Sequence, residues 1–378
     1  MTPRERIEAV LNFQTPDRIP VIFGVSNATG IKMGTYRKLK SLLGVHSSER
    51  YLYDWPELGT ALPEEEMMVH LKSDVRGVWD RFPEQVINRN WGREPHSNYI
   101  DDWGSGAREI NPGEWFPDIH PLADATSIKE LEAYQGWPDM NDPFRVSQVK
   151  QSAVEIRAKT DYAIMATPWL LFPFERAHAM QGLEPFLLNM ALRPEFAEAM
   201  LRKNLELCKT LMGHFLRELG DNVDIIKIGD DLGTQKSLMI SPDMYRKILK
   251  PIHAELISFI REKTRASVFF HSDGDIFDLI EDFIEIGVDI LNPIQTSAGK
   301  MSDLPALKDK YGGRIIFCGG IDTQEILPRG TPEDVRKEVK RVSSILGEGG
   351  GYILGPVHTV MNDVPAENVL AMIQAVEE

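Results

Sequence analysis

The sequence contains little cysteine. Its 378 residues include two, Cys208 and Cys318, which are too few for a disulfide framework. The small disulfide-stabilised class of protein is therefore excluded. Cys208 lies in a helical pattern of apolar residues, which indicates a place in the core. Cys318 directly follows a predicted strand, so it stays a candidate for a functional site.

The chain is also poor in positive charge and in long apolar runs. It has 42 Lys and Arg residues against 57 Asp and Glu, a net charge of −15, which argues against a general nucleic-acid surface. No apolar run approaches the roughly 20 residues of a membrane-spanning helix, and the first residues do not resemble a signal peptide. We therefore expect a cytoplasmic protein with neither nucleic acid nor membrane as a partner.

Two phosphate-binding motifs are missing as well. No GxGxxG follows a predicted strand, and no GxxxxGK[ST] occurs. Their absence argues against a dinucleotide-binding doubly wound sheet and against a P-loop. The hydrophobic fraction of 42% is nevertheless sufficient for a substantial core.

Short apolar runs alternate with helical patterns along most of the chain. The runs predict eight strands, at 19–23, 74–80, 162–167, 223–229, 266–270, 288–291, 314–317 and 351–354. Capping sequences at Thr2–Glu5 and Thr331–Asp334 predict two of the helix starts. Eight βα units favour an α/β fold, a (β/α)8 TIM barrel in a single domain over 1–378. A doubly wound sheet is the alternative.

Residues 81–140 have a different composition. Five of the seven tryptophans lie in or beside this segment, among prolines, glycines and asparagines. Trp-Gly pairs at 91–92 and 103–104 predict short antiparallel hairpins. We expect an aromatic-rich hairpin insertion at about 81–140 that covers a pocket; a flap that only packs against the barrel is equally consistent with the composition.

Polar side chains follow several of the predicted strands. They are Asp230, Asp231, His271, Asp273, Asn292, Gln295, Cys318, Asp322 and His358. In a barrel the carboxyl ends of the strands meet at one face, where active sites lie. Any one of these residues could instead cap a helix, hold a loop or fill the core. As a set at strand ends, they predict a functional site.

His271 and Asp273 are two residues apart, directly after a predicted strand. Both can face one metal ion if the chain begins to turn there, and His358 or Cys318 could complete the set of ligands. Catalytic zinc sites use such nitrogen, sulfur and oxygen ligands and keep one position open. A His-x-Cys pair would be a stronger zinc signal than His-x-Asp.

Five blocks carry a resemblance to a known superfamily. They are Arg4–Arg6 with Pro16–Val21, Asp230–Gln235, His271–Gly274, Gly319–Gln324, and His358 with Asp363–Asn368. On these blocks the chain resembles the uroporphyrinogen decarboxylase superfamily, and its corrinoid-linked methyltransferase branch more than the decarboxylase of haem synthesis. The resemblance implies a barrel, a small methyl donor, and a corrinoid (cobalamin) cofactor carried on a partner protein. It also allows a homodimer.

The resemblance implies a metal site as well. Thiol methyltransferases of the superfamily bind zinc through His-x-Cys and a later cysteine; here Asp273 and His358 stand at those two cysteine positions. The implied ligands of zinc or another divalent ion are thus His271, Asp273 and His358, with Cys318 as a further candidate. Gln295 lies near the place of a glutamate ligand in a related methionine synthase.

A second departure concerns the decarboxylase itself. That family carries an arginine-rich stretch after its first strand, whereas residues 24–30 of this chain contain no arginine. Asp80 lies near the place of the decarboxylase's catalytic aspartate. The departure disfavours a porphyrinogen substrate, because several carboxylates would lack cationic partners.

Three functions follow from these observations. The first is a metal-assisted, corrinoid-dependent methyltransferase in which Asp230, Asp231 and His271 act at the catalytic centre. The second is a metal-independent decarboxylase of a tetrapyrrole or another carboxylate. The third is a non-catalytic corrinoid- or tetrapyrrole-binding protein.

Overall fold

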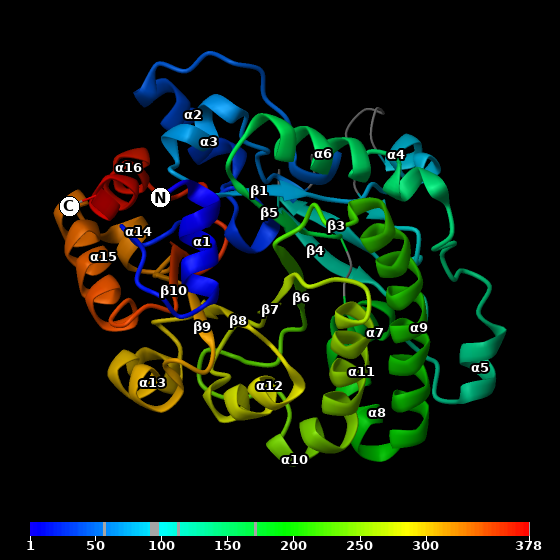
Figure 1. Cartoon of the computed structure of the whole chain (residues 1–378). Coiled ribbons are helices and arrows are strands. Elements are labelled where there is room, and N and C mark those ends of the chain that lie inside the picture. The colour runs from blue at the N-terminus through cyan, green and yellow to red at the C-terminus, as the bar shows by residue number, and fades with distance from the viewer. Residues whose placement is uncertain (56–57, 91–97, 112–113, 170–171, 378) are drawn as a thin grey trace.

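Seven parallel strands form one curled sheet, which gives an α/β fold of the TIM-barrel type (Figure 1). The computed structural model describes residues 1–55, 58–90, 98–111, 114–169 and 172–377. In spatial order the strands are β1 (Val75–Val78), β5 (Ala163–Ala166), β6 (Ile225–Gly229), β7 (Ser267–His271), β8 (Ile290–Ile294), β9 (Ile316–Ile321) and β10 (Tyr352–Pro356). All seven overlap predicted strands, although β8 and β9 begin two residues later than predicted and extend further.

The eighth predicted strand, at 19–23, is not formed as a strand. This segment makes a single parallel bridge, Val21 to Leu354 of β10. Pro20 has no N–H to donate, and the Val21 N–H donates to the Asp74 carboxylate instead of a neighbouring backbone. Even so, the Ile22 N–H donates to the Leu354 carbonyl and the Asp74 N–H to the Val21 carbonyl. The segment therefore links the two edges of the sheet through isolated hydrogen bonds and a buried carboxylate.

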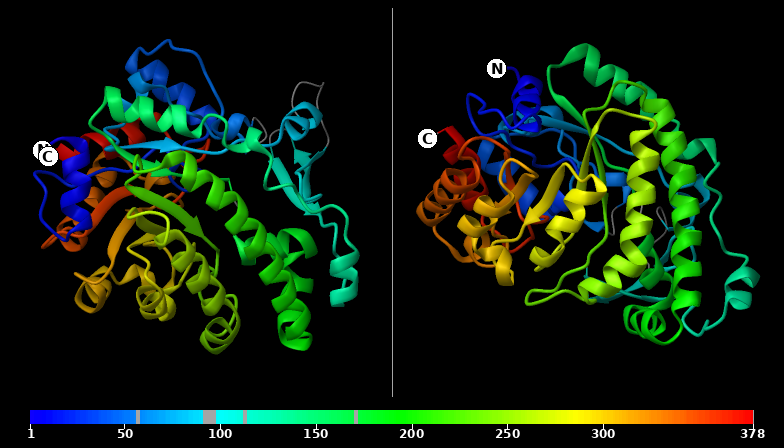
Figure 2. Two further views of the ribbon diagram at one scale, coloured as in Figure 1. Left: turned by 45° about the vertical axis from the view of Figure 1, so that its right-hand side comes forward. Right: turned by 60° about the horizontal axis from the view of Figure 1, so that its bottom comes forward.

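Helices lie outside the curled strands, as Figure 2 shows. Those of the N-terminal part are α1 (Pro3–Leu11), α2 (Met33–Leu43), α3 (Glu65–His70), α4 (Glu84–Asn90), α5 (Ile128–Ala133) and α6 (Val149–Lys159). After β5 come α7 (Pro173–Gln181), α8 (Leu183–Leu192) and α9 (Pro194–Leu219), and after β6 come α10 (Pro242–Met244) and α11 (Lys250–Arg261). The remainder are α12 (Ile280–Ile286), α13 (Leu304–Tyr311), α14 (Ile326–Arg329), α15 (Pro332–Leu346) and α16 (Ala366–Gln374).

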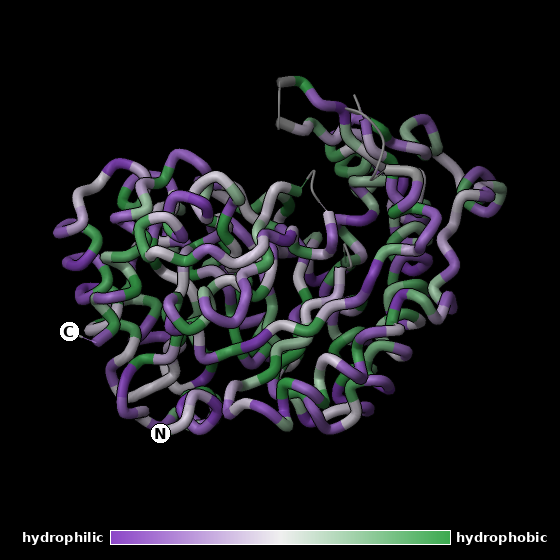
Figure 3. Tube along the Cα trace, turned by 90° about the horizontal axis from the view of Figure 1, so that it is seen from above, coloured by the Kyte–Doolittle hydropathy of each residue, from purple (hydrophilic) through white to green (hydrophobic). Residues whose placement is uncertain are grey.

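Local sequence explains where several helices begin. Thr2 and Glu5 form a capping box at α1, and Thr331 and Asp334 form one at α15, each with proline in the first turn. Both predicted helix starts are confirmed. Hydrophilic and hydrophobic residues alternate along the outer helices (Figure 3). In α15, for example, the apolar residues Val335, Val339, Val342 and Leu346 are the buried ones. The two termini lie on the same side of the molecule.

A second, antiparallel sheet consists of β2 (Asn98–Ile100), β3 (Gly106–Asn111) and β4 (Glu114–Ile119). The turn between β2 and β3 contains the Trp103–Gly104 pair, and Gly104 takes a positive φ of 80°. The other predicted pair, Trp91–Gly92, lies outside the described residues. The segment also contains α4 and α5, which the hairpin prediction did not include. That it is an insertion stays a prediction.

The buried apolar residues form two clusters. The larger extends from Ile7 in α1 to Ala375 after α16 and fills the space between strands and helices. The smaller joins Leu52, Tyr53 and Trp55 with Phe82 and Val86, and Tyr99 and Trp169 pack against it. The small aromatic cluster thus lies between the β1 end of the sheet and the antiparallel sheet.

Candidate functional site

The strands bring three of the predicted residues together. His271 is the last residue of β7, Asp273 lies two residues beyond it, and His358 follows β10. One ligand atom from each lies within 4.8 Å of the other two. Asp273 Oδ2 is 3.9 Å from His271 Nε2 and 3.7 Å from His358 Nε2. The two imidazole rings are 5.5 Å apart between centroids. Two nitrogens and a carboxylate oxygen therefore converge on one point. His271, Asp273 and His358 are called the convergent group below.

Asn292 in β8 fixes the orientation of His271. Its Oδ1 is 2.7 Å from His271 Nδ1. An amide oxygen can only accept, so this bond assigns the ring proton to Nδ1 and leaves Nε2, which lies 3.9 Å from Asp273 Oδ2, with the lone pair. A ring hydrogen bond of this kind is usual for histidines that ligate metals. We did not anticipate this role for Asn292 from the sequence.

The Asp273 carboxylate is buried, and one of its oxygens has no hydrogen-bond donor among the described residues. Its backbone N–H donates to Asp231 Oδ1 at 2.9 Å, whereas its buried Oδ1 has no hydrogen-bond partner among the described residues. Burial raises the pKa of the Asp273 carboxyl to about 6, with His271 lowering it and Asp231 raising it. A desolvated carboxylate oxygen without a donor is costly. The position therefore suits a cation.

Both histidines favour the neutral form. Burial lowers the pKa of His271, which the charges of Asp273 and Asp231 partly oppose. Burial also lowers the pKa of His358, while Asp231 raises it and Lys227 and Lys32 lower it. A neutral imidazole has the lone pair that a metal requires.

Two charged residues that the sequence analysis missed extend the site. Lys227 is buried in β6; burial lowers its pKa, and Glu175, Asp231 and Asp273 act in the opposite direction. Burial raises the pKa of Glu175 well above its usual value, and Asp231 and Asp230 add to this. Lys227 could have been identified from the sequence, because it is a single lysine within the apolar run Ile225–Ile228.

Asp231 and Asp230 are neighbours with different surroundings. Asp231 Oδ1 lies 4.0 Å from His271 Nε2, at the rim of the convergent group. Asp230 is fully buried, and its carboxylate accepts from the backbone N–H groups of Phe174 and Glu175 and from His253 Nε2 at 2.8–3.1 Å. The two backbone contacts hold the start of α7, and the contact with His253 ties Asp230 to α11. The structure thus brings Asp231 to the site and uses Asp230 as a helix cap.

Cys318, Gln295 and Asp322 are not in the convergent group. The thiol of Cys318 is buried in β9 beside Asn292, and burial raises its pKa to about 12. Gln295 accepts from the Gly274 N–H and donates to Gln235, so both ends of its amide are used in the turn. Asp322 accepts from three backbone N–H groups of the loop that follows it. Of the two roles considered for Asp322, these contacts agree with holding the loop.

Asp80 lies after β1 and is buried. Its Oδ1 accepts the Trp169 N–H at 2.6 Å, and burial raises the pKa of its carboxyl to about 6. Asp80 therefore fixes the backbone of a tryptophan in the aromatic cluster.

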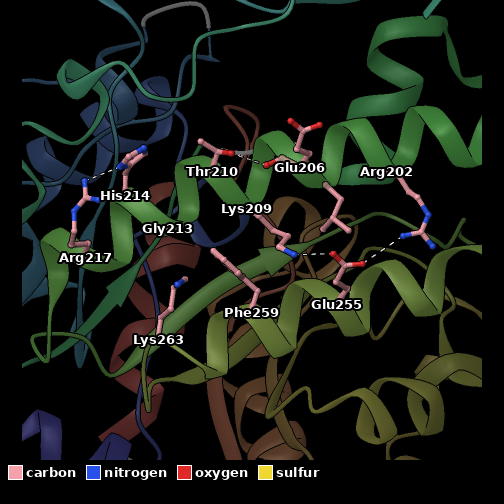
Figure 4. A pocket seen from close by; sticks show the side chains of 11 residues that line it. Arg202, Glu206, Lys209, Thr210, Gly213, His214, Arg217, Glu255, Phe259 and Lys263 are labelled. Carbon is pink, nitrogen blue, oxygen red and sulfur yellow. Dashed lines mark hydrogen bonds and ion pairs between the residues drawn. The ribbon is translucent and has the colours of Figure 1, made fainter. Parts of the chain in front are cut away.

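Two cavities differ in the side chains that line them. One, of about 800 Å³, has aromatic walls that include Trp55, Tyr99, Trp115 and Trp169, and is also lined by Lys32 and Asp363. The other, of about 630 Å³, is a charged groove between α9 and α11 (Figure 4). There Glu255 pairs with Lys209 at 2.8 Å and with Arg202 at 3.5 Å. Neither cavity has His271, Asp273 or His358 among its lining residues.

No helix in the described part of the chain is both long and apolar enough to cross a membrane. This finding agrees with the absence of long apolar runs in the sequence.

Comparison with known proteins identifies relatives of two activities. A uroporphyrinogen decarboxylase from Methylococcus capsulatus is 30% identical over 280 residues, 73% of this chain and 72% of the relative. A methylated-thiol–coenzyme M methyltransferase from Methanosarcina mazei is 24% identical over 245 residues, 64% and 61% of the two chains. A uroporphyrinogen decarboxylase from Legionella pneumophila is 25% identical over 194 residues, 51% of each. The chain thus spans about half to three quarters of the length of these relatives.

A solved structure supports the fold. A methyltransferase from Methanosarcina mazei matches with a TM-score of 0.66 and 18% identity, covering 100% of this chain and 98% of that one. At this identity the match shows the shared architecture. The family model described as uroporphyrinogen decarboxylase (URO-D) matches residues 109–378, more than half of the sequence. The chain therefore belongs to the uroporphyrinogen decarboxylase family.

Proposed function

We propose that the protein is a methyltransferase that moves a methyl group between a small methylated or methoxylated compound and a corrinoid on a partner protein. The observation that carries the proposal is the convergence of His271, Asp273 and His358, with ligand atoms within 4.8 Å of one another. The methyltransferase among the relatives supports this choice within the family.

The three side chains fit a divalent metal ion, with zinc as the first candidate. Ligand atoms at zinc–ligand distances of about 2.1 Å and tetrahedral angles lie about 3.4 Å apart. The separations of 3.7 and 3.9 Å from Asp273 Oδ2 are close to this value. Two imidazoles and a carboxylate form a set that also accepts other divalent ions. When bound, the ion would supply Lewis-acid polarisation of the donor's heteroatom.

The chain's own residues have distinct tasks in this proposal. Asn292 holds the tautomer and angle of His271. Asp231 fixes the backbone of Asp273 and lies at the rim, where it can orient the donor or exchange a proton with it. Asp230 supports α7 through the N–H of Glu175 and donates its own backbone N–H to the His271 carbonyl at 3.0 Å. Cys318 packs beside Asn292.

We further propose that the whole chain acts as one domain, a complete barrel closed by the segment 19–23. The residues near 81–140 would be an insertion over its mouth. The buried cluster from Ile7 to Ala375 supports the single domain. The aromatic contacts of Tyr99 with Trp55 and Trp115 support the covering role. The homodimer that the resemblance allows stays a prediction.

A decarboxylase of some carboxylate is the second candidate. The buried Asp80, whose pKa of about 6 keeps a proton available near neutrality, favours it, as does the 30% identity to a decarboxylase. The absence of arginine in residues 24–30 disfavours a porphyrinogen as its substrate.

The proposal is tested by the absorption spectrum of cobalamin. The metal-loaded protein is mixed with cob(I)alamin and a panel of methyl ethers, methyl thioethers and methylamines. We expect conversion to methylcob(III)alamin with at least one donor, and loss of conversion after removal of the metal with a chelator. Carbon dioxide release from a carboxylate, with no cobalamin methylation by any donor, would instead select the decarboxylase.

A further inference from the structure

The groove of about 630 Å³ between α9 and α11 carries an excess of positive charge. Arginine and lysine contribute four of its lining residues, and glutamate contributes two. The whole chain has the opposite balance, with 42 arginines and lysines against 57 aspartates and glutamates. A local excess of cations on an acidic protein attracts anions to that place and not to the rest of the surface. The groove is therefore suited to an anionic partner.

The two ends of the groove differ in how far their cations are neutralised. Figure 4 shows Arg202 at one end and Arg217 and Lys263 at the other. At the first end, Glu255 pairs with Lys209 at 2.8 Å and with Arg202 at 3.5 Å. At the second end, Lys263 makes no ion pair with any residue that the structure describes. The charge available to a ligand is thus concentrated at the Lys263 end.

The guanidinium of Arg217 is held in place at that end. Its Nη2 lies 2.7 Å from His214 Nδ1, and His214 Nε2 lies 3.0 Å from Asn141 Oδ1. Because an arginine can only donate, His214 accepts at Nδ1 and carries its proton on Nε2. The Arg217 side chain is nevertheless 65% exposed, and Glu218 approaches it only to 3.7 Å. An exposed guanidinium that is already oriented loses less side-chain entropy when it binds a carboxylate.

The floor of the groove is apolar. Two lysines flank the ring of Phe259, with the ammonium of Lys209 5.2 Å and that of Lys263 4.5 Å from its centroid. Gly213 of α9 faces this ring, since a Cβ at that position would lie 3.3 Å from Phe259 Cζ. Leu205 also lines the groove. An apolar side chain beside the ligand's carboxylates would therefore lose its contact with water on this floor.

The length of the groove favours a peptide segment over a small molecule. Its basic side chains extend along α9 from Arg202 to Arg217, about 15 residues, which corresponds to about 22 Å of helix. An extended chain covers that distance with about seven residues. An adjoining cavity of about 250 Å³ shares His214 and Arg217 and continues to Asn141. The binding surface is thus elongated.

We propose that this groove is a docking surface for an acidic segment of a partner protein. Carboxylates of the segment pair with Lys263 and Arg217, and an apolar side chain between its carboxylates packs on Phe259. The inference goes beyond the proposed function and does not depend on it, because no residue of the convergent group lines the groove.

Nucleic acid and a second copy of this chain are the competing occupants. A phosphate backbone would extend beyond the groove and meet the surface of a chain with a net charge of −15. Two copies of so acidic a chain repel each other. An acidic segment confined to the groove meets neither obstacle.

Fluorescence anisotropy of a labelled peptide tests the inference on the full chain at low ionic strength. The probe is a peptide of seven residues, a central phenylalanine with glutamates on both sides. One comparison peptide has glutamine in place of every glutamate, and the other keeps only the central three residues. We expect the probe to bind at least about 10-fold more tightly than either comparison peptide, and to bind more weakly as salt is added.

Charge reversal locates the binding site. Lys263→Glu and Arg217→Glu should each weaken probe binding about 10-fold or more, because a repelling charge replaces an attracting one. Lys150 of α6 is exposed, and the side chain of Arg329 is 72% exposed. Lys150→Glu and Arg329→Glu are therefore matched controls with the same change in net charge, and we expect binding within about twofold of the parent. Circular dichroism confirms that each variant is folded.

Several outcomes would overturn the inference. They are no binding of the acidic probe, equal binding of its glutamine counterpart, and an equal loss in Lys263→Glu and Lys150→Glu. Tighter binding of a labelled oligothymidylate would assign the groove to nucleic acid. Self-association of the chain in sedimentation velocity, abolished by Lys263→Glu, would assign it to a second copy. The cobalamin assay tests the proposed function separately, so failure of either proposal leaves the other standing.

Discussion

At the scale of single residues, neighbours in sequence have divided roles. Asp230 and Asp231 both follow β6, yet one caps α7 and the other borders the convergent group. The strand direction explains the division, because consecutive side chains point to opposite sides of an extended chain. Of these two adjacent carboxylates, Asp230 therefore supports a helix and Asp231 lies at the candidate site.

The convergent group predicts that substitution of one of its ligands removes the bound metal. We expect purified protein to hold about one divalent ion per chain, and His271→Ala and Asp273→Ala each to reduce this to near zero, since each removes one of three ligands. Inductively coupled plasma mass spectrometry measures the content. His214→Ala is the matched control, because His214 lies on α9 among exposed partners. Equal metal content in all four proteins would contradict the site.

Asp80 predicts a pH-dependent effect on stability. Its pKa is raised from the ordinary 3.8 to about 6 in the folded protein. As pH rises from about 4 to 6, the unfolded chain loses this proton first, so the folded state loses stability across that window. Above pH 6 the penalty is on the order of 3 kcal/mol.

Asp80→Asn removes the titrating group and keeps an oxygen for the Trp169 N–H. We expect the variant to match the parent near pH 4 and to be more stable by about 2–3 kcal/mol at pH 8. Urea unfolding at both pH values measures the difference. A gain of equal size at pH 4 and pH 8 would show that ionisation is not the cause.

At the scale of elements, the junction between β10 and β1 is the weakest part of the sheet pattern. Asp74 is buried there and accepts from Arg6 Nη1 at 2.6 Å, from Arg18 at 2.9 Å and from the Val21 N–H at 2.8 Å. One carboxylate thus replaces part of the missing strand ladder.

Asp74→Ala should therefore destabilise the fold strongly. Removing the carboxylate leaves Arg6 and Arg18 without this partner in a buried setting, which costs about 3–5 kcal/mol. Asp243→Ala is the control: its side chain is 99% exposed, and the expected change is within about 0.5 kcal/mol. Urea denaturation compares the two variants. A loss below 1 kcal/mol for Asp74→Ala would mean that backbone bonds alone close the sheet.

The same junction shows what the sequence could and could not predict. Runs such as Ile225–Ile228 and Ile290–Leu291 are long enough and apolar enough to identify buried strands. The run at 19–23 looks alike, but its partners include a side chain from residue 74, which only the fold reveals. Helix starts at Thr2 and Thr331 were predictable because capping is local. Asn292 was already a candidate at its strand end, but its contact with His271 was not predictable. Glu175 and Lys227 were missed altogether. These roles arise from contacts between distant segments.

At the scale of the whole molecule, charge restricts the substrate. The chain carries a net charge of −15, and Asp231, Asp273 and Glu175 lie in or beside the site. The cations that act on this region are Lys32 and Lys227. Two lysines can offset one or two substrate carboxylates, which suits a monoanion better than a polyanion.

Porphyrinogen decarboxylation is the strictest test of this charge argument. Uroporphyrinogen carries several carboxylates, and each one buried without a cationic partner is costly. Residues 24–30 supply no arginine, and Lys32 already donates to the Leu58 carbonyl. We expect no measurable coproporphyrinogen from uroporphyrinogen under anaerobic conditions, by chromatography with fluorescence detection. The Methylococcus capsulatus decarboxylase, assayed in parallel, is the positive control. Turnover within about 10-fold of that control would show that two lysines suffice, and would favour the decarboxylase over the methyltransferase.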